Sequence, residues 1–317
     1  MKTKTLQQIE GMKKQTIGVE IEFCGITRDN AAKVLGDFFN QTPYYIGGAY
    51  YAWDIRDQQG RKWQITRDSS IQAPDNQKCE LVTPILKYED IETLQEIVRR
   101  LRKAGAKSNA DLKCGVHIHI GADIDKEGGH TAQTLRNLAN IMASREQLIG
   151  KAIRIGRNRI SYCEVTDRAF LKRLNEKKPK TMRELERVWY NNDSTFHQHY
   201  DGTRYHMLNL HATFTKGTVE FRLFNFSKPF GDKKGGLHAG ELKAWIHLCL
   251  AMSQQAKMVR TASQKQPQIE NEKFAMRTWM NRLGLMGDEF KSTRKHLMKA
   301  LDGDAAWRYG RPDRPVA

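Results

Sequence analysis

The sequence predicts an α+β domain with a mainly antiparallel sheet, and three observations lead to this fold class. Strand-like segments recur without the regular strand–helix–strand alternation of a parallel sheet. Amphipathic helical patterns lie between them; the clearest is at 88–104, where apolar residues recur on one helical face. Three strand segments also place polar residues at every second position of an apolar run, which is typical of a sheet with one buried face.

The first half of the chain predicts five strands and three helices. Residues 1–14 are expected to be a polar lead, and Asp29 or Asn30 is expected to cap the first helix. The polar turn at 57–60 predicts a hairpin between the second and third strands. The expected strands are 16–23, 53–56, 62–66, 80–84 and 114–121, and the expected helices are 29–39, 88–104 and 131–149.

The second half is expected to be mostly helical. Thr181 with Glu184 predicts a capping box at the start of one helix. Two strands, 205–210 and 218–226, are expected to pair around a turn at 215–217, and a glycine-rich loop follows at 229–236. The expected helices are 166–174, 180–190, 238–258, 273–283 and 288–301. We expect a catalytic domain at 1–260 and a helical hairpin at 261–317 packed on it.

Composition and charge indicate the kind of protein to expect. The 317 residues can bury a sizeable core, and no apolar run reaches the length of a membrane span. The N-terminus lacks the apolar stretch of a signal peptide, and the five cysteines show no metal-binding spacing. These features predict reduced thiols and a cytoplasmic protein. The net charge of +17 favours polyanionic or acidic partners, a class that includes nucleotides and nucleic acids.

Three strand segments carry two polar residues at positions i and i+2. These pairs are Glu20 with Glu22, His117 with His119, and Glu220 with Arg222. Side chains at i and i+2 of a strand lie on one face, so each pair faces away from its apolar neighbours. Buried charges without partners cost several kcal/mol each, and a divalent metal ion with a phosphorylated ligand would offset that cost. Together with Glu80, these carboxylates suit Mg²⁺ or Mn²⁺.

The segments GVEIEF (18–23), ELVTPIL (80–86), CGVHIHIG (114–121) and GTVEFRLFN (217–225) together resemble the amidoligase family in order and spacing. This family is a branch of the carboxylate–amine ligase superfamily, which includes glutamine synthetase and glutamate–cysteine ligase. The last segment is similar to the Glu-x-Arg strand of glutamine synthetase. The resemblance extends from about Gly18 to Phe226, and the tail is similar to the C-terminal helices of such proteins.

The resemblance implies a fold and a chemistry. It implies a curved antiparallel sheet, a half-barrel like the glutamine synthetase catalytic domain, with helices on its convex side. ATP and its metal ions would bind the concave face, and a carboxylate would be joined to an amine through an acyl phosphate. The chain has no Walker-type phosphate loop, so a nucleotide site must be of another type.

The resemblance also implies a role for each matched residue. Metal ligands would be Glu20, Glu22, Glu80, Glu220 and His117. His119 would contact phosphate, or the two histidines would exchange these roles. Arg222 would hold the transferring phosphoryl group. We further expect Asp68 to orient the amine, or to be a turn residue only, and Arg159 to bind phosphate or a carboxylate, or to be a surface residue. His206 and Asn209 are candidates near the nucleotide, but on a regular strand only one of them can face the site.

Three alternatives remain open at this stage. The two histidines with Glu20 or Glu22 would suit a metal-dependent β-barrel hydrolase or oxygenase. Cys114 beside the histidines would suit a cysteine-nucleophile transferase. The basic tail would suit a nucleic-acid-binding protein, although its apolar residues favour packing, so nucleic acid is not the expected partner. The carboxylate and amine substrates, whether small molecules, peptides or protein side chains, and the oligomeric state are beyond the sequence.

Overall fold

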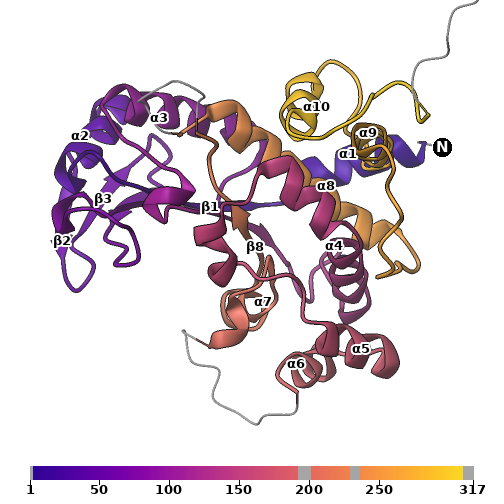
Figure 1. Ribbon diagram of the computed structural model, residues 1–317. Coiled ribbons are helices and arrows are strands. Elements are labelled where there is room, and N and C mark those ends of the chain that lie inside the picture. The colour runs from indigo at the N-terminus through magenta and orange to yellow at the C-terminus, as the bar shows by residue number, and fades with distance from the viewer. Residues whose placement is uncertain (1–2, 192–200, 229–235, 310–317) are drawn as a thin grey trace, which may run out of the picture.

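The computed structural model describes residues 3–191, 201–228 and 236–309, and an open, curved sheet of eight strands lies at its centre (Figure 1). The strands are β1 (Ile17–Phe23), β2 (Tyr44–Gly47), β3 (Ala52–Arg56), β4 (Lys62–Thr66), β5 (Cys79–Val82), β6 (Val116–Gly121), β7 (Leu208–Asn209) and β8 (Thr218–Phe224). Their order in the sheet is β2-β3-β4-β5-β1-β6-β8-β7, and each neighbouring pair is antiparallel. The predicted α+β class and antiparallel sheet are therefore confirmed.

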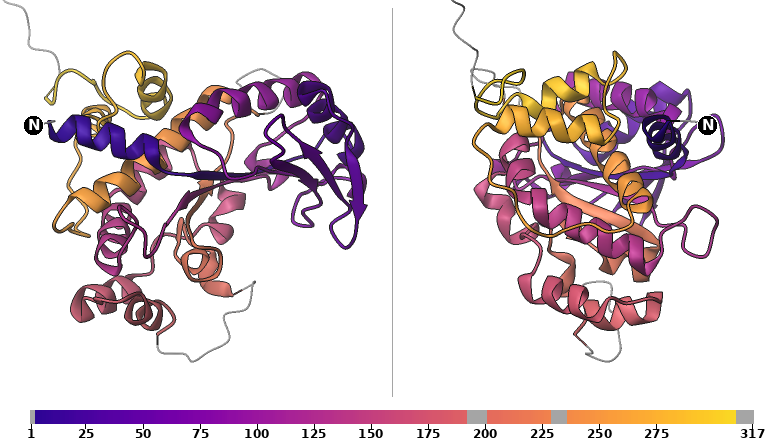
Figure 2. Two further views of the ribbon diagram at one scale, coloured as in Figure 1. Left: turned by 180° about the vertical axis from the view of Figure 1, so that it is seen from behind. Right: turned by 90° about the vertical axis from the view of Figure 1, so that its right-hand side faces the viewer.

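Helices surround this sheet and provide most of the remaining core. They are α1 (Lys4–Lys14), α2 (Arg28–Phe39), α3 (Ile91–Lys103), α4 (Ala132–Ile153), α5 (Arg168–Lys177), α6 (Met182–Trp189), α7 (His211–Lys216), α8 (Ala239–Met258), α9 (Glu272–Arg282) and α10 (Lys291–Met298). Helix α8 contacts α1, α3, α4, α10 and strand β6. It is therefore the helix around which the helical layer assembles, as Figure 2 shows. None of the described helices is long and apolar enough to cross a membrane.

The two faces of the sheet differ in character. Val19 and Ile21 of β1, Ile118 of β6 and Phe221 of β8 are buried in one continuous apolar core. Their neighbours at alternate positions are the polar pairs singled out in the sequence, which lie on the opposite face. The alternation thus places the candidate site residues on the face away from the core.

The N-terminal segment corrects one prediction. Residues 1–14 were expected to be a polar lead, but residues 4–14 form α1. Thr3 caps this helix by accepting a hydrogen bond from the Leu6 amide. Gln8 is buried, and its side-chain amide donates to the carbonyls of Ala251 and Leu283. A helix that docks through a hydrogen-bonded glutamine lacks a wide apolar stripe, which is why the periodicity gave no sign of it.

Two helix starts also differ in detail from the prediction. Helix α2 begins at Arg28, and its cap is Thr27 rather than Asp29 or Asn30. Thr181 caps α6 as predicted, accepting a hydrogen bond from the Glu184 amide. The Glu184 carboxylate accepts from the Lys180 amide, so it does not complete the expected box.

The predicted strand pair at 205–210 and 218–226 is only partly correct. Strand β7 has two residues, and α7 rather than a simple turn connects it to β8. Helix α7 ends at Gly217, whose φ of +69° suits a residue without a side chain. Most of the predicted glycine-rich loop, 229–235, lies outside the described residues.

The C-terminal helices pack on the rest of the chain. Trp279, Leu283, Phe290 and Leu297 are buried, and α10 contacts α8, α9 and α4. These apolar side chains therefore serve packing. Helices α9 and α10 lie close to the expected helices 273–283 and 288–301, and the division of the chain at residue 260 stays a prediction.

Candidate active site

The register of the central strands gathers the predicted polar residues on one face of the sheet. Glu20 lies opposite His117, Glu22 opposite Glu80, and His119 opposite Glu220. Asn209 lies opposite Glu220 on its other side. Directly opposite residues of neighbouring strands share a face. Five strands that are distant in sequence therefore contribute to one cluster.

The acids and histidines of this cluster form three overlapping groups that could each hold a cation. The first contains Glu20, His119 and Glu220, the second Glu20, His117 and Glu80, and the third Glu22, Glu80 and Asp68. Within each group the candidate ligand atoms lie within 4.8 Å of one another. Glu20 belongs to two groups, and Glu80 to two groups. The groups therefore form a continuous chain of candidate cation positions, with carboxylate and imidazole donors that suit Mg²⁺ or Mn²⁺.

The carboxylates of this chain sit in contrasting electrostatic environments. Burial, together with the charges of Glu20, Glu22 and Asp68, holds the pKa of Glu80 well above its ordinary value. Burial also acts to raise the pKa of Glu220, but His119, Arg222 and His117 outweigh it and lower that pKa to about 2. The end of the cluster near Glu80 is therefore short of positive charge, and a bound cation would supply it.

Glu20 lies between the two histidines. Its Oε2 is 3.1 Å from Nδ1 of His117, and its Oε1 is 3.4 Å from Nε2 of His119. Burial alone would raise the pKa of Glu20, but His119, His117 and Lys216 together hold it well below the ordinary value. Nε2 of His119 is buried and makes no hydrogen bond within the described residues. That nitrogen is therefore available to a ligand.

The pKa values of the two histidines are shifted in opposite directions. Burial and the nearby Arg222 lower the pKa of His117. Burial acts in the same direction on His119, but the carboxylates of Glu220 and Glu20 outweigh it, so the pKa of His119 is raised. The structure therefore places the more readily protonated imidazole beside Glu220 and Glu20.

Two buried arginines lie against the same cluster. Arg222 forms an ion pair with Glu220, and Arg159 lies 3.4 Å from Glu22 and 3.3 Å from Nε2 of His117. The arginines are 4% and 2% exposed, respectively, and Nε of each has no hydrogen-bond partner among the described residues. Guanidinium groups with donors to spare are natural ligands of phosphate and carboxylate.

Arg159 reaches the cluster from a 3₁₀ turn, Arg157–Tyr162, and fits because of Gly115. A Cβ at position 115 would lie 2.1 Å from Nη2 of Arg159. The ring of Tyr162 lies 5.7 Å from the Arg159 guanidinium, and the ring of Tyr205 lies 5.8 Å from that of Arg222. Each arginine is thus held beside an aromatic ring.

The remaining predicted residues divide into two sets. Asp68 lies at the cluster, and its carboxylate also accepts a hydrogen bond from the Ser70 amide. Asn209 donates a hydrogen bond of 2.7 Å to Glu220. His206 lies elsewhere, with its Nδ1 2.9 Å from the Val165 carbonyl oxygen. Of the two residues on that segment, only Asn209 faces the cluster.

A large cavity of about 630 Å³ opens onto this face, and its lining combines acids with basic side chains. The acids are Glu20, Glu22, Asp68 and Glu80, and the basic residues are Arg67, Arg159, Arg204, Lys216 and Arg222. Arg67 pairs with Asp75, which is outside the lining, whereas Arg159 and Lys216 pair with acids of the lining. A cavity with both kinds of side chain can accept cations and an anionic group close together.

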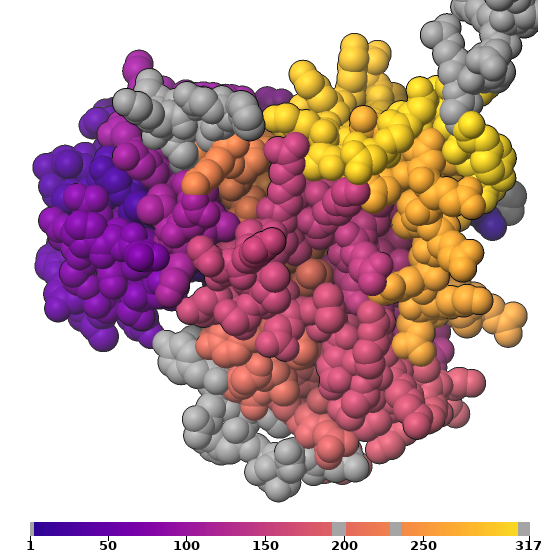
Figure 3. Space-filling model, in the orientation of Figure 1, coloured from indigo at the N-terminus to yellow at the C-terminus, as the bar shows by residue number. Residues whose placement is uncertain are grey.

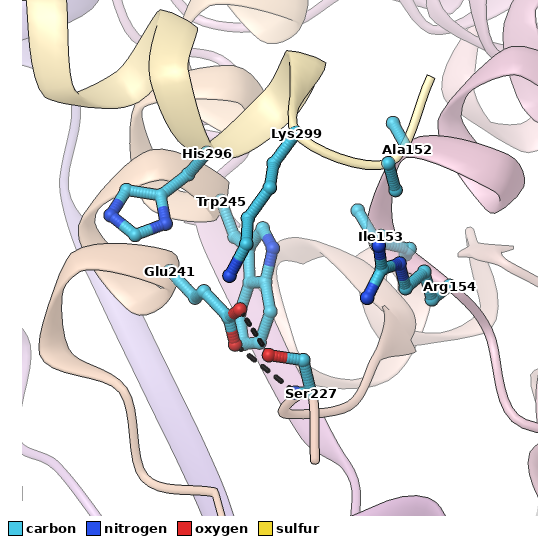
Figure 4. Close-up of a pocket in the computed structure, with 9 residues that line it drawn as sticks. Ala152, Ile153, Arg154, Ser227, Glu241, Trp245, His296 and Lys299 are labelled. Carbon is cyan, nitrogen blue, oxygen red and sulfur yellow. Dashed lines mark hydrogen bonds between the residues drawn. The ribbon is translucent and has the colours of Figure 1, made fainter. Parts of the chain in front are cut away.

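A second, much smaller pocket of about 20 Å³ lies between α4, α8 and α10 and contains none of the predicted site residues (Figure 4). In this pocket the Glu241 carboxylate accepts hydrogen bonds from the Ser227 amide at 3.1 Å and from the Ser227 hydroxyl at 2.5 Å. The Glu241 carboxylate is therefore already engaged.

Sequence reasoning missed three features of the large cavity. Lys216 ends α7 and places its ammonium group 3.4 Å from Glu20. Tyr205 covers Arg222, and Tyr50 forms part of the rim. Lys216 stands two residues before the Glu-x-Arg strand begins, but nothing in its sequence context shows that a helix points it at another strand.

The cysteine-nucleophile alternative disagrees with this geometry. All five cysteines are free and buried. The interaction of Cys114 with Cys24, reinforced by burial, raises the pKa of Cys114. A buried thiol with a raised pKa is a poor nucleophile.

The open face of the antiparallel sheet thus brings acids, histidines and arginines together beside one cavity. The model of the family described as "Putative amidoligase enzyme" matches residues 13–253. This match covers most of the chain, so the chain belongs to that family, and the resemblance noted in the sequence is confirmed. The family description is that of a ligase.

Two further comparisons were made. A search of curated proteins found no match. Among solved structures, a bifunctional glutathione synthetase from Pasteurella multocida is similar, with a TM-score of 0.47 and 12% sequence identity. The similarity covers 93% of this chain and 48% of that one. The chain therefore spans about half the length of that protein.

Proposed function

We propose that this protein is an ATP-dependent carboxylate–amine ligase that forms an amide or isopeptide bond through an acyl phosphate, with Mg²⁺ or Mn²⁺. The observation that carries the proposal is the adjacency of two unlike sets of groups in one cavity. Three overlapping acid and histidine groups adjoin two buried arginines, each with an unpaired Nε–H. Phosphoryl transfer requires both positioned cations and direct donors to the moving group.

The reaction balances as follows. A carboxylate oxygen attacks the γ-phosphorus of ATP, the bond to the bridging oxygen breaks, and ADP leaves. The amine then attacks the acyl carbon, inorganic phosphate departs, and the amine loses a proton to give the amide. Divalent ions, when bound, supply charge neutralisation for the phosphate groups.

The chain's own residues have distinct proposed parts in this reaction. Glu20, Glu22, Glu80 and Glu220 with His117 would hold the cations. Nε2 of His119, which lies 3.4 Å from Glu20 and makes no hydrogen bond among the described residues, fits either a cation or a phosphate oxygen. Arg222 and Arg159 would bind the phosphoryl group and the substrate carboxylate. Asp68 is close enough to Glu22 and Glu80 to share a cation with them, or to accept a proton from the amine.

The same proposal includes the finer description of the fold. We take the open sheet to be a half-barrel of the glutamine synthetase kind, with its concave face as the catalytic surface. We also assign catalysis to residues 1–260 and a supporting role to the hairpin at 261–317. Every proposed catalytic residue lies within the first segment.

The hydrolase or oxygenase alternative requires two histidines and one carboxylate around a single metal ion. Among the described residues, no candidate cation group contains both histidines. The site also holds more carboxylates than that chemistry uses. The ligase therefore accounts for more of the side chains present.

The test is ADP release with pooled substrates. The protein is incubated with ATP, Mg²⁺ and pools of carboxylates and amines, and ADP is measured with and without the amine pool. We expect at least one pair of pools to stimulate ADP release, and Glu220→Gln and Arg222→Lys to lower that release by about 100-fold or more. Both variants should keep the far-UV circular dichroism of the wild type.

Two results would overturn the proposal. One is the absence of both nucleotide binding and stimulated ADP release from the folded wild type. The other is full activity in either variant, because Arg222 and Glu220 are placed at the centre of the site. Tight binding of iron or zinc without ATP dependence would instead favour the hydrolase or oxygenase.

A further inference from the structure

Exposed aromatic and aliphatic side chains gather at one end of the sheet. On β2 and the turn that follows it, they are Tyr44 (72% exposed), Tyr45 (48%), Ile46 (49%), Tyr50 (54%) and Tyr51 (47%). We call this set the aromatic edge. Tyr44 and Ile46 lie on one face of β2 and Tyr45 on the other, so exposed apolar side chains border both faces of this edge. Single exposed apolar residues are ordinary on a protein surface, but five within eight positions point to an interaction.

Strand β2 is the terminal strand of the sheet. It pairs only with β3 among the described strands, so its outer edge has backbone N–H and C=O groups that no described strand uses. A peptide segment that reaches this edge and turns to run along β2 could pair with these groups, because a peptide repeats the same donors and acceptors at the same spacing. Neither a polysaccharide nor a nucleic acid offers that repeat.

The aromatic edge is continuous with the cavity. The strand register places Tyr44 opposite Asp54, Asp54 opposite Gln64, Gln64 opposite Val82, and Val82 opposite Glu20. These residues form one row across the catalytic face, from the acid cluster to the free edge. Gln64, Val82, Ala49 and Tyr50 all line the cavity. The open space therefore leads from the proposed reaction centre toward the aromatic edge.

The length of this row exceeds a small substrate. Four strand spacings of about 4.8 Å separate β1 from β2, or roughly 19 Å along the sheet, which about six extended residues would span. The cavity at the acid cluster, of about 630 Å³, lies within the roughly 300–1000 Å³ of ordinary small-molecule pockets. The row extends beyond this cavity to the edge of the sheet, and that length suits a polymer segment.

The chemistry of the row favours a polypeptide over a polyanion. Between Glu20 and Tyr44 the row consists of Val82, Gln64 and Asp54, none of which is basic. Gln64 donates a hydrogen bond of 2.7 Å to Asp54. The remaining amide and carboxylate atoms of these two side chains are suited to hydrogen bonds with the amides of a peptide. A phosphodiester chain would instead require basic side chains along its path.

We propose that one of the two substrates is a polypeptide, whose reacting end lies at the acid cluster while its body crosses β5, β4 and β3 to the aromatic edge. This inference rests on the proposed ligase function and names the substrate class of the same cavity. The aromatic edge then acts as a specificity surface, with contacts remote from the reacting atoms.

The test measures peptide binding separately from catalysis. Wild-type protein is mixed with Mg²⁺, a non-hydrolysable ATP analogue and a random decapeptide pool, and the peptides retained after gel filtration are quantified by mass spectrometry. The test variant is Tyr44→Ser with Ile46→Ser. The matched control is Tyr309→Ser with Ile85→Ser, which changes the same residue types at sites that are 81% and 73% exposed and outside the cavity. In Figure 3 the lobe that contains β2–β4 lies at the left, on the opposite side from the C-terminal helices α9 and α10.

We expect the wild type and the control to retain the same peptides and the edge variant to retain about tenfold less, with equal binding of the nucleotide analogue by all three proteins. Equal retention by the edge variant, or no retention by the wild type while the nucleotide still binds, would overturn the polypeptide inference and leave the ligase proposal standing. Loss of nucleotide binding in the wild type would count against the ligase proposal itself.

Discussion

Glu80→Gln should make the metal-free protein more stable while it weakens the binding of Mg²⁺. The Glu80 carboxyl is half-buried beside Glu20, Glu22 and Asp68, and burial with these charges raises its pKa well above 4.5. Glutamine has the same shape and no charge. Its carbonyl can still accept the hydrogen bond that the Thr66 hydroxyl donates to Glu80. The substitution therefore removes the repulsion and leaves the packing in place.

The size of the effect follows from proton linkage. A carboxyl whose pKa is raised in the folded state binds more protons in the folded protein than in the unfolded chain. Its contribution to the free energy of unfolding therefore falls as the pH rises from about 4.5 through the folded pKa. At pH 7 the unfolded carboxyl is ionised, whereas the raised pKa favours the protonated form in the folded state. The difference of 2.5 pH units costs the wild type at most about 3 kcal/mol, at about 1.4 kcal/mol per unit. Glu80→Gln removes this cost.

The assay is urea unfolding in EDTA at pH 5, 6 and 7, followed by the same series with Mg²⁺. We expect the stability advantage of Glu80→Gln to be small at pH 5 and to grow with pH, and we expect Mg²⁺ to stabilise the wild type more than the variant. Glu89→Gln, at an exposed site, is the control and should change stability by about 0.5 kcal/mol or less. If Glu80→Gln is less stable than the wild type at pH 7 in EDTA, the carboxyl is not strained and the reasoning is wrong.

Three further predictions follow from the same geometry. Binding of Mg²⁺ at pH 7 should release a proton from Glu80, detected as a buffer-dependent heat in calorimetry that disappears in Glu80→Gln; equal heats in buffers of different ionisation enthalpy would contradict this. Gly115→Ala should lower ADP release by about tenfold or more with the fold retained, because the new methyl group displaces the Arg159 guanidinium. The control Gly202→Ala, where a Cβ meets no atom within 4 Å, should leave ADP release unchanged. Cys114→Ser should keep its ligase turnover, and loss of turnover in a folded variant would restore the thiol mechanism.

Much of the polar face of the sheet was predictable because its signal is local. A pair at i and i+2 within an apolar run determines which face each side chain takes, and Glu20, His117 and Glu220 all lie where that rule places them. The pairing of Glu22 with Glu80 is of another kind. It depends on the register of two strands separated by more than fifty residues, which no local pattern specifies.

The parts that sequence reasoning missed or left open come from loops and short helices. Asp68 follows β4 in a turn, Arg159 comes from a 3₁₀ turn, and Lys216 ends a six-residue helix. Such segments have too few residues for a periodicity, so the direction of a side chain depends on tertiary packing. Helix α1 was not predicted for a related reason: it is anchored by a buried Gln8 rather than by an apolar stripe.

The charge of the site explains why most of its acids lie on strands. Acids that must hold several cations close together repel one another when the cations are absent, so they need the rigid positions that strands provide. The opposing charges in this structure come from long side chains: Lys216 lies against Glu20, Arg222 against Glu220, and Arg159 between Glu22 and His117. Under the proposed function, bound cations would take over the neutralisation of these carboxylates. The guanidinium groups would then be free to bind the phosphoryl group, so the arrangement that stabilises the metal-free protein would also place its anion-binding groups next to the reacting atoms.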